Sequence, residues 1–443
     1  MLQRCRGDLA PSTRIERARP PTTRDSQGKW TSVVVTTTDV AQVKVRRPVG
    51  LPEPPKLGWH ARATRWRWIA APAALALGVR VISLLLADLA LRMLVAVGVL
   101  APSRYLGVIE SWRVYDAVWY MHIAQLGYDA APPRNLVTFF PLYPLLIRLL
   151  GAPLAALGVP AAYLLAAMLV SWAAFTAACV LLYRLALPRL GHIGALCAVA
   201  LLAVFPFAFF FGAAYSESVF LLAAVGAFCA VERQRWATAA IIAAFAGALR
   251  PPGVLLGLAV AIAYGAHLLH EGRRPDRTAF WLALMPAGLL AYFAYLWLRF
   301  GDFFAYQHAS ARGWHGGTLQ WGGITSTLGY LLHANALFTG KQFNPMLFAL
   351  YAVLAVVFLA LCVPLWSRFG PHYAFFVLSG IVAPLATFPT PASLGRYLSV
   401  LFPAFLVAAD LLRRHPIARQ LVVLASGALL CLMALLFVLG GMD

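Results

Sequence analysis

Long apolar runs, separated by short polar segments, fill most of the chain after about residue 68. A run of about 18 or more apolar residues can cross a bilayer as a helix. The short run 236–249 ends at a Pro-Pro pair, which breaks a helix, so it could be half of one broken helix. We predict an all-α polytopic membrane protein with about eleven membrane helices, at roughly 68–94, 160–183, 191–211, 215–231, 236–249, 253–269, 279–299, 345–365, 371–388, 397–412 and 417–438.

The first long break between these spans carries a pattern that predicts a helix lying in the membrane interface. Asp116 lies one position round from the apolar face of this helix, so we expect its carboxylate to point toward a cavity. Tyr120 and Tyr128 are the predicted interfacial anchors. A lone aspartate on such a helix is usually solvated or a cap, so its position leaves both interpretations open. The apolar residues at helical spacing are Tyr115, Val118, Trp119, Ile123 and Leu126.

The segment Phe139-Phe-Pro-Leu-Tyr-Pro144 follows this helix and contains two prolines three residues apart. Because proline fixes φ and ends helices, we predict a rigid turn at the level of the lipid. The alternative is a floor for an isoprenoid tail, and the residues themselves favour the turn.

Only 12% of the 443 residues are charged, yet the net charge is +20. In membrane proteins Lys and Arg collect in cytoplasmic loops, so this charge does not indicate a nucleic-acid partner. We predict that the basic side is cytoplasmic, that the N-terminus lies there and that the C-terminus lies outside. If the spans alternate across the membrane, the following arginines all lie on this basic side: Arg62, Arg65, Arg67, Arg184, Arg189, Arg233, Arg235, Arg273, Arg274, Arg277, Arg368, Arg413, Arg414 and Arg419.

The N-terminal segment 1–60 is rich in Arg, Thr, Pro and Val and has no long apolar run. We predict a disordered basic cytoplasmic tail followed by a transmembrane domain, 61–443. The six cysteines are scattered without a CxxC motif, so neither a disulfide framework nor a zinc site is indicated.

The polar, motif-like segments fall almost entirely on the side opposite the basic loops. Any chemistry is therefore predicted to be extracytoplasmic. These segments are 101–150, Ala214–Ser218, Arg250–Gly253, 300–344 and Pro389–Tyr397.

Three charged residues of these segments join Asp116 as candidates. Glu217 stands at the mouth of a span, where an ionisable group marks either function or a helix N-terminus. Arg250 and Arg396 either bind phosphate through a planar guanidinium or snorkel to the interface. Arg396 is the better candidate because proline and glycine residues shape the backbone around it. Nothing in the sequence requires a metal, although Asp302 and Glu217 could hold a divalent cation.

Five motifs in order resemble a known family over roughly residues 75–412. Together they are similar to the mannosyltransferase that adds the second mannose to the glycosylphosphatidylinositol anchor and to its bacterial homologues. The chain departs at Tyr115, where the family usually has Trp, and at Arg250-Pro-Pro-Gly253, where it often has Arg-Ser-Asn-Gly. The motifs are Tyr115-Asp-Ala-Val-Trp-Tyr-Met-His-Ile-Ala-Gln-Leu-Gly-Tyr128, Phe139-Phe-Pro-Leu-Tyr-Pro144, Tyr215-Ser-Glu-Ser218, Gly301-Asp-Phe-Phe-Ala-Tyr306 and Ser393-Leu-Gly-Arg-Tyr-Leu398.

The resemblance implies a GT-C fold in the cell membrane. It implies inverting transfer of a sugar, typically mannose, from a polyprenyl- or dolichyl-phosphate co-substrate to an outer acceptor, which could be a glycan, a glycolipid or a protein. Asp116 would be the catalytic base. The residues that bind the donor phosphate would be Arg396, Arg250 and Tyr397. Residues that contact or position the acceptor would be Glu217, Ser216, Tyr215, Trp119 and Tyr120.

Two other classes remain open from the sequence. A transporter or flippase of lipid-linked sugars would use the same aromatic and basic outer surface without chemistry. The lack of an obvious internal repeat, and polar groups on one face rather than at the midplane, count against it. A structural scaffold would not need the helix that bears Asp116.

Overall fold

The computed structural model describes residues 22–24, 30–32, 60–128, 134–314, 316, 319–332 and 344–440. The chain separates into two compact units, Met1–Val49 and Gly50–Asp443. In the first unit β1 (Thr22–Arg24) pairs antiparallel with β2 (Trp30–Ser32). Apart from these strands and residue 60, the predicted tail lies outside the described residues, and its disorder stays a prediction.

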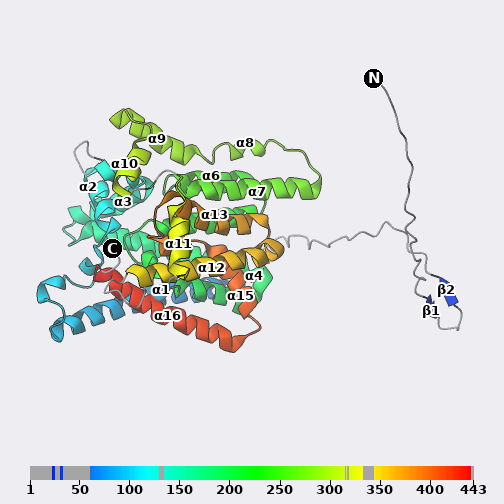
Figure 1. Ribbon diagram of the computed structural model, residues 1–443, viewed down its shortest axis with the longest axis horizontal. Coiled ribbons are helices and arrows are strands. Elements are labelled where there is room, and N and C mark those ends of the chain that lie inside the picture. Colours follow the sequence, from blue (N-terminus) through cyan, green and yellow to red (C-terminus); the bar gives the residue numbers. More distant parts are fainter. Residues whose placement is uncertain are drawn as a thin grey trace, which may run out of the picture. The chain divides into compact units, whose positions relative to one another are not determined.

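All the regular secondary structure in the described residues of the second unit is helical (Figure 1). Five of its helices contain a segment long and apolar enough to cross a membrane: α1 (His60–Ala96), α4 (Ala162–Ala203), α7 (Gly253–Glu271), α12 (Asn344–Arg368) and α16 (Pro416–Val438). Six are apolar but shorter: α3 (Leu142–Ala156), α5 (Glu217–Val231), α6 (Trp236–Gly247), α9 (Ala287–Phe300), α13 (Pro371–Thr387) and α15 (Phe402–Leu412). The predicted polytopic all-α class is confirmed, and the number of crossings stays a prediction.

Short helices and 3-10 turns connect the longer ones. The helices are α2 (Asp116–Leu126), α8 (Ala279–Leu282), α10 (Ala305–Trp314), α11 (Gly322–Leu332) and α14 (Leu394–Ser399). The 3-10 turns are η1 (Pro102–Arg104), η2 (Glu110–Trp112), η3 (Arg134–Thr138) and η4 (Ala208–Phe211).

Several predicted spans differ from the helices that form. The spans 160–183 and 191–211 become one element, α4, which breaks at Gly191 (φ 70°, ψ −179°). Its 42 residues would measure about 63 Å if straight, twice the hydrocarbon thickness, so the break is what lets both arms lie within one bilayer. The span 397–412 divides into α14 and α15, because residues 400–401 leave the helical path.

A helix that the apolar-run rule overlooked is α3. It begins at Leu142, inside the predicted turn Phe139–Pro144, and Pro153 lies within it. The chain turns at Phe139–Pro141, whereas Tyr143 and Pro144 already belong to the helix, where proline is tolerated in the first turn. Phe140 and Tyr143 are buried in protein, so the segment is not an open floor for a lipid tail.

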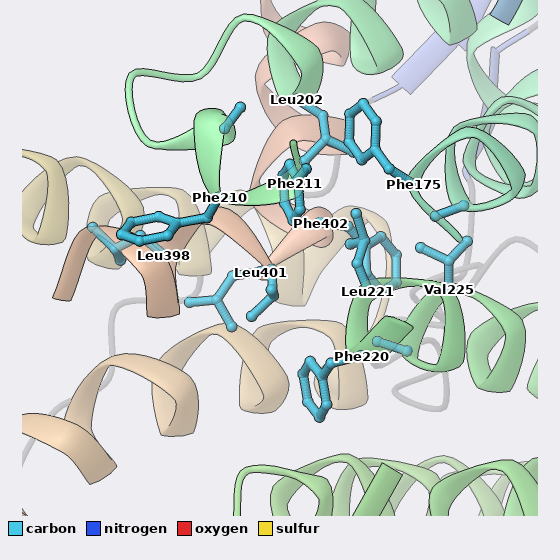
Figure 2. Close-up of a cluster of buried hydrophobic side chains, with 14 of the residues drawn as sticks. Phe175, Leu202, Phe210, Phe211, Phe220, Leu221, Val225, Leu398, Leu401 and Phe402 are labelled. Carbon is cyan, nitrogen blue, oxygen red and sulfur yellow. The ribbon is translucent and has the colours of Figure 1, made fainter. Parts of the chain in front are cut away.

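The core is centred on α4, which packs against α1, α3, α5 and α15. Figure 2 shows part of it, where aromatic and aliphatic side chains from α4, η4, α5 and α15 meet. Phe175 stacks on Phe211 at 4.7 Å between ring centroids. Phe220 and Leu398, also in this cluster, are near neighbours in sequence of Glu217 and Arg396, so the core fixes the backbone on which these charges stand.

Two groups of charged residues lie at opposite ends of α5. Glu217 begins the helix, and Glu232 follows its last residue. Glu232 pairs with Arg189 at 3.0 Å and accepts a hydrogen bond from Tyr373 at 2.8 Å. The helix is about 22 Å long, and it separates a predicted basic loop from a predicted outer motif; on which side of a membrane each lies stays a prediction.

Candidate active site

Four charged residues from widely separated segments meet at one point. Asp116 is the first residue of α2 and Glu217 the first of α5. Arg250 stands in the turn between α6 and α7, and Arg396 in α14. Asp116 and Arg396 are 280 positions apart in sequence, so only the packing of the helices brings them together.

Arg396 joins the two acids of this group. Its Nε donates to Glu217 Oε1 at 2.6 Å, and its Nη1 donates to Asp116 Oδ2. Arg250 Nη1 lies 2.6 Å from the same Glu217 oxygen as an ion pair, although its orientation is not that of a hydrogen bond. Two carboxylates and two guanidinium groups therefore form a cluster without net charge, which reduces the cost of burying them.

Burial divides the cluster into inner and outer members. The Glu217 side chain is 0% exposed and that of Arg250 is 6% exposed. The side chains of Asp116 and Arg396 are 14% and 15% exposed. A substrate can therefore reach Asp116 and Arg396, while Glu217 contacts its neighbouring arginines and orients them.

Aromatic rings hold the two arginines in place. The Arg396 guanidinium lies 5.3 Å from the ring centroid of Tyr215, and that of Arg250 lies 5.2 Å from the ring of Tyr397. Cations over aromatic faces are attracted by the ring quadrupole. Tyr215 also accepts a hydrogen bond at its hydroxyl from the backbone N–H of Asp116, at 3.3 Å.

A buried hydrogen-bond network lies behind the charges. The hydroxyls of Tyr120 and Ser216 are 3.1 Å apart. Tyr143 bonds Ser171 at 2.8 Å, and Ser171 donates to the carbonyl of Tyr215 at 3.1 Å. The sequence interpretation missed Tyr143 and Ser171. A polar Ser171 inside an otherwise apolar run was the signal that could have identified it.

The backbone is strained beside both outer members of the cluster. Tyr115, directly before Asp116, has φ 51°, and Ser393, which precedes α14, has φ 63°. Positive φ is unfavourable for residues with a Cβ and tends to occur at functional sites. Each of these residues directly precedes the short helix that carries Asp116 or Arg396.

The surroundings fix the protonation of two groups outside the spans. Burial by itself would lower the pKa of Arg396, but Glu217 and Asp116 outweigh it and hold this pKa well above the ordinary value. Burial, followed by the negative charge of Glu217, raises the pKa of Tyr120 to about 12. Arg396 is therefore a cation and Tyr120 a neutral hydroxyl at physiological pH.

The predicted apolar face of the interfacial helix is buried by protein at one position, Ile123. Val118 and Leu126 are 42% and 64% exposed, whereas the protein-facing side of α2 is formed by Ala117, Tyr120, Met121, Ile123 and Ala124. Exposed Val118 and Leu126 suit a side that faces lipid, and the opposite side packs on protein, because both sides of a helix in a membrane can be apolar.

The prediction that Tyr120 and Tyr128 anchor this segment in the membrane interface is wrong. Tyr120 and Tyr128 are buried, and Tyr128 donates a hydrogen bond to the carbonyl of Phe139 at 2.5 Å. Trp119 packs half-buried against the core, and no described contact joins it to the ionic cluster.

The two carboxylates considered for a metal have other partners. Asp302 pairs with His308 at 2.8 Å, and Glu217 with the two arginines. Among the described residues, no three His, Cys, Asp or Glu side chains are grouped closely enough to hold a metal ion.

Comparison with protein families identifies the chain. The family model described as mannosyltransferase (PIG-V) matches residues 82–321, more than half of the sequence. The chain belongs to this family. As a membrane mannosyltransferase it is an enzyme, and the transporter interpretation gains no support. Among curated proteins, none matches.

The matched region includes Asp116, Glu217 and Arg250 but ends before Arg396. The evidence that Arg396 belongs to the candidate site is therefore its ion pairs with Asp116 and Glu217, not the family match.

Proposed function

We propose that this mannosyltransferase takes its mannose from a polyprenyl-phosphate donor and transfers it with inversion to an extracytoplasmic acceptor, on a GT-C fold. The observation that carries the proposal is Arg396, which lies between Asp116 and Glu217. It puts a cation suited to phosphate directly beside a carboxylate that can accept a proton, and both are partly exposed.

In the proposed reaction, an acceptor hydroxyl attacks the anomeric carbon of the mannosyl group. The bond from that carbon to the phosphate oxygen breaks, and polyprenyl phosphate leaves with the electron pair. Asp116 takes the proton of the hydroxyl as general base. Arg396, supported by Arg250 and Tyr397, stabilises the charge that develops on the departing phosphate.

The ion pair between Arg396 and Asp116 gives the donor a second role. Asp116 Oδ2 accepts a hydrogen bond from Arg396, which makes this oxygen a weaker base toward a hydroxyl. A phosphate competes for the same guanidinium, since arginine binds phosphate and carboxylate through the same fork. Donor binding would thus release the base, and Glu217 would keep Arg396 in place during the exchange.

Transfer of label tests the proposal. Membranes containing the wild-type protein are incubated with polyprenyl-phosphate mannose labelled in the sugar, and products are separated from donor. We expect labelled product from the wild type and a rate about 10²–10⁴-fold lower from Asp116→Asn, which keeps size but cannot act as a base. Asp276→Asn, an exposed loop carboxylate, is the matched control.

Each outcome of the assay decides something specific. Transfer from a nucleotide-activated mannose, with none from the lipid-linked donor, would overturn the donor assignment. Near-wild-type turnover by Asp116→Asn would exclude Asp116 as the base. A product that retains the anomeric configuration of the donor would overturn the single displacement.

A further inference from the structure

An apolar groove lies between α1, the second arm of α4 and α16. It has a volume of about 580 Å³ and is lined by Leu75, Leu196, Ala200 and Val423, among others. This volume is within the range of about 300–1,000 Å³ that ligand pockets occupy. Figure 1 shows α1 and α16 side by side, and both helices contact α4.

The groove is polar at one end only. Arg419 and Gln420, in the first turns of α16, are its polar lining residues. Arg413, six positions earlier, pairs with Asp410, whereas no carboxylate among the described residues pairs with Arg419. An apolar channel that ends at an uncompensated guanidinium matches a molecule with a hydrocarbon chain and an anionic head.

The groove is separate from the candidate active site. Phe437, near the far end of α16, packs against Tyr115 and Tyr215 of that site, with ring centroids 5.5 and 5.8 Å apart. Arg419 precedes Phe437 by 18 residues, which is about 27 Å along a helix. The Arg419 end of the groove therefore lies close to a full membrane thickness from the active-site end of α16, so a lipid whose headgroup is held there cannot serve as sugar donor.

We propose that this groove is a binding site for an anionic glycerophospholipid of the opposite leaflet. One acyl chain lies between α1, α4 and α16, and the phosphate pairs with Arg419. Basic pockets between membrane helices bind anionic headgroups in this way. The bound lipid joins α1 to α16 and thereby supports the helix whose other end packs on the active site.

Native mass spectrometry of the purified full-length protein tests the site, with phosphatidylglycerol and phosphatidylcholine as competing probes. We expect one retained phosphatidylglycerol per wild-type chain, and about tenfold or greater loss of affinity in Arg419→Ala, because a charge-assisted contact is removed. Ala200→Phe, which fills the groove, should abolish retention. Arg414→Ala and Ala425→Phe, at exposed positions outside the groove lining, are matched controls.

Several results would overturn the site. Equal retention of both lipids, or undiminished retention by Ala200→Phe, would remove the basis for a specific groove. Preferential retention of added undecaprenyl phosphate would assign the groove to the carrier lipid instead. If Ala200→Phe does not fold, Ala71→Phe fills the same groove from α1, and its retention of lipid decides the question.

Discussion

At the scale of single residues, Arg396 is the member of the cluster that contacts both acids. It also lies over Tyr215, so its position depends on three partners at once. A planar fork holds two acids in fixed directions, whereas a lysine ammonium is a compact charge without that geometry. The chemistry of the cluster therefore depends on arginine itself rather than on positive charge alone.

Arg396→Lys should lower kcat/KM for the lipid-linked donor by roughly 10–150-fold. The loss corresponds to one charge-assisted hydrogen bond of about 1.5–3 kcal/mol. Initial rates at varied donor concentration measure it. Arg414→Lys, at an exposed loop position, is the control. An unchanged kcat/KM in Arg396→Lys would show that the residue does not bind donor phosphate.

Glu217→Gln should destabilise the fold by about 3–5 kcal/mol, because it leaves two buried guanidinium groups without their shared partner. Thermal unfolding of the purified protein measures the change. Glu110→Gln removes an exposed carboxylate 3.6 Å from Arg113 and should cost at most about 1 kcal/mol. Equal shifts in the two variants would mean that Glu217 does not hold the cluster together.

At the scale of elements, close helix packing positions the arginine turn. A Cβ on Gly253 would lie 2.3 Å from backbone atoms of Ala246 and Gly247, so α6 and α7 approach too closely for any larger residue. Arg250 stands in the connection between these helices. The glycine of Arg250-Pro-Pro-Gly253 therefore fixes where the guanidinium reaches the cluster.

Gly253→Ala should force α6 and α7 apart, cost about 1–3 kcal/mol and reduce transfer, because Arg250 moves with the turn. Gly265→Ala lies in the same helix with nothing within 4 Å of the added Cβ, and should leave the stability unchanged or slightly higher. Unfolding temperature and transfer rate are measured for both. Wild-type stability and activity in Gly253→Ala would mean that the turn tolerates the shift.

At the scale of the whole molecule, α5 and α16 each connect the candidate site to the other end of the helical unit. Glu217 and Glu232 flank α5, and Arg419 and Phe437 lie near the two ends of α16. Because both helices are apolar between these ends, we expect the site and the basic loops to lie at opposite membrane surfaces. Which surface faces the cytoplasm is the remaining prediction.

We expect the loop before α2 to be extracytoplasmic and the loop between α15 and α16 cytoplasmic. Single cysteines at Leu106 and Arg414, both exposed, are placed in a chain whose native cysteines are replaced by alanine. An impermeant thiol reagent should label the first in intact cells and the second only after lysis. The reverse pattern would invert the topology and place the candidate site inside.

The sequence by itself determined the class of the protein and the set of candidate residues. Apolar runs of bilayer length dictate membrane helices because backbone groups in lipid must bond within the segment. Asp116, Glu217, Arg250 and Arg396 were recognisable because charges are costly in or near a membrane and tend to mark function. Turns were predictable where prolines cluster.

Only the tertiary structure decided which of these charges meet and which side of each helix faces protein. A period of apolar residues does not distinguish lipid from protein, so the sequence did not show that Ala117, Tyr120, Met121 and Ala124 form the buried face of α2. The pairing of Asp116 with Arg396 spans 280 positions and depends on the packing of α4 with its neighbours. Such contacts arise from the fit of whole helices, and no local pattern in the chain encodes them.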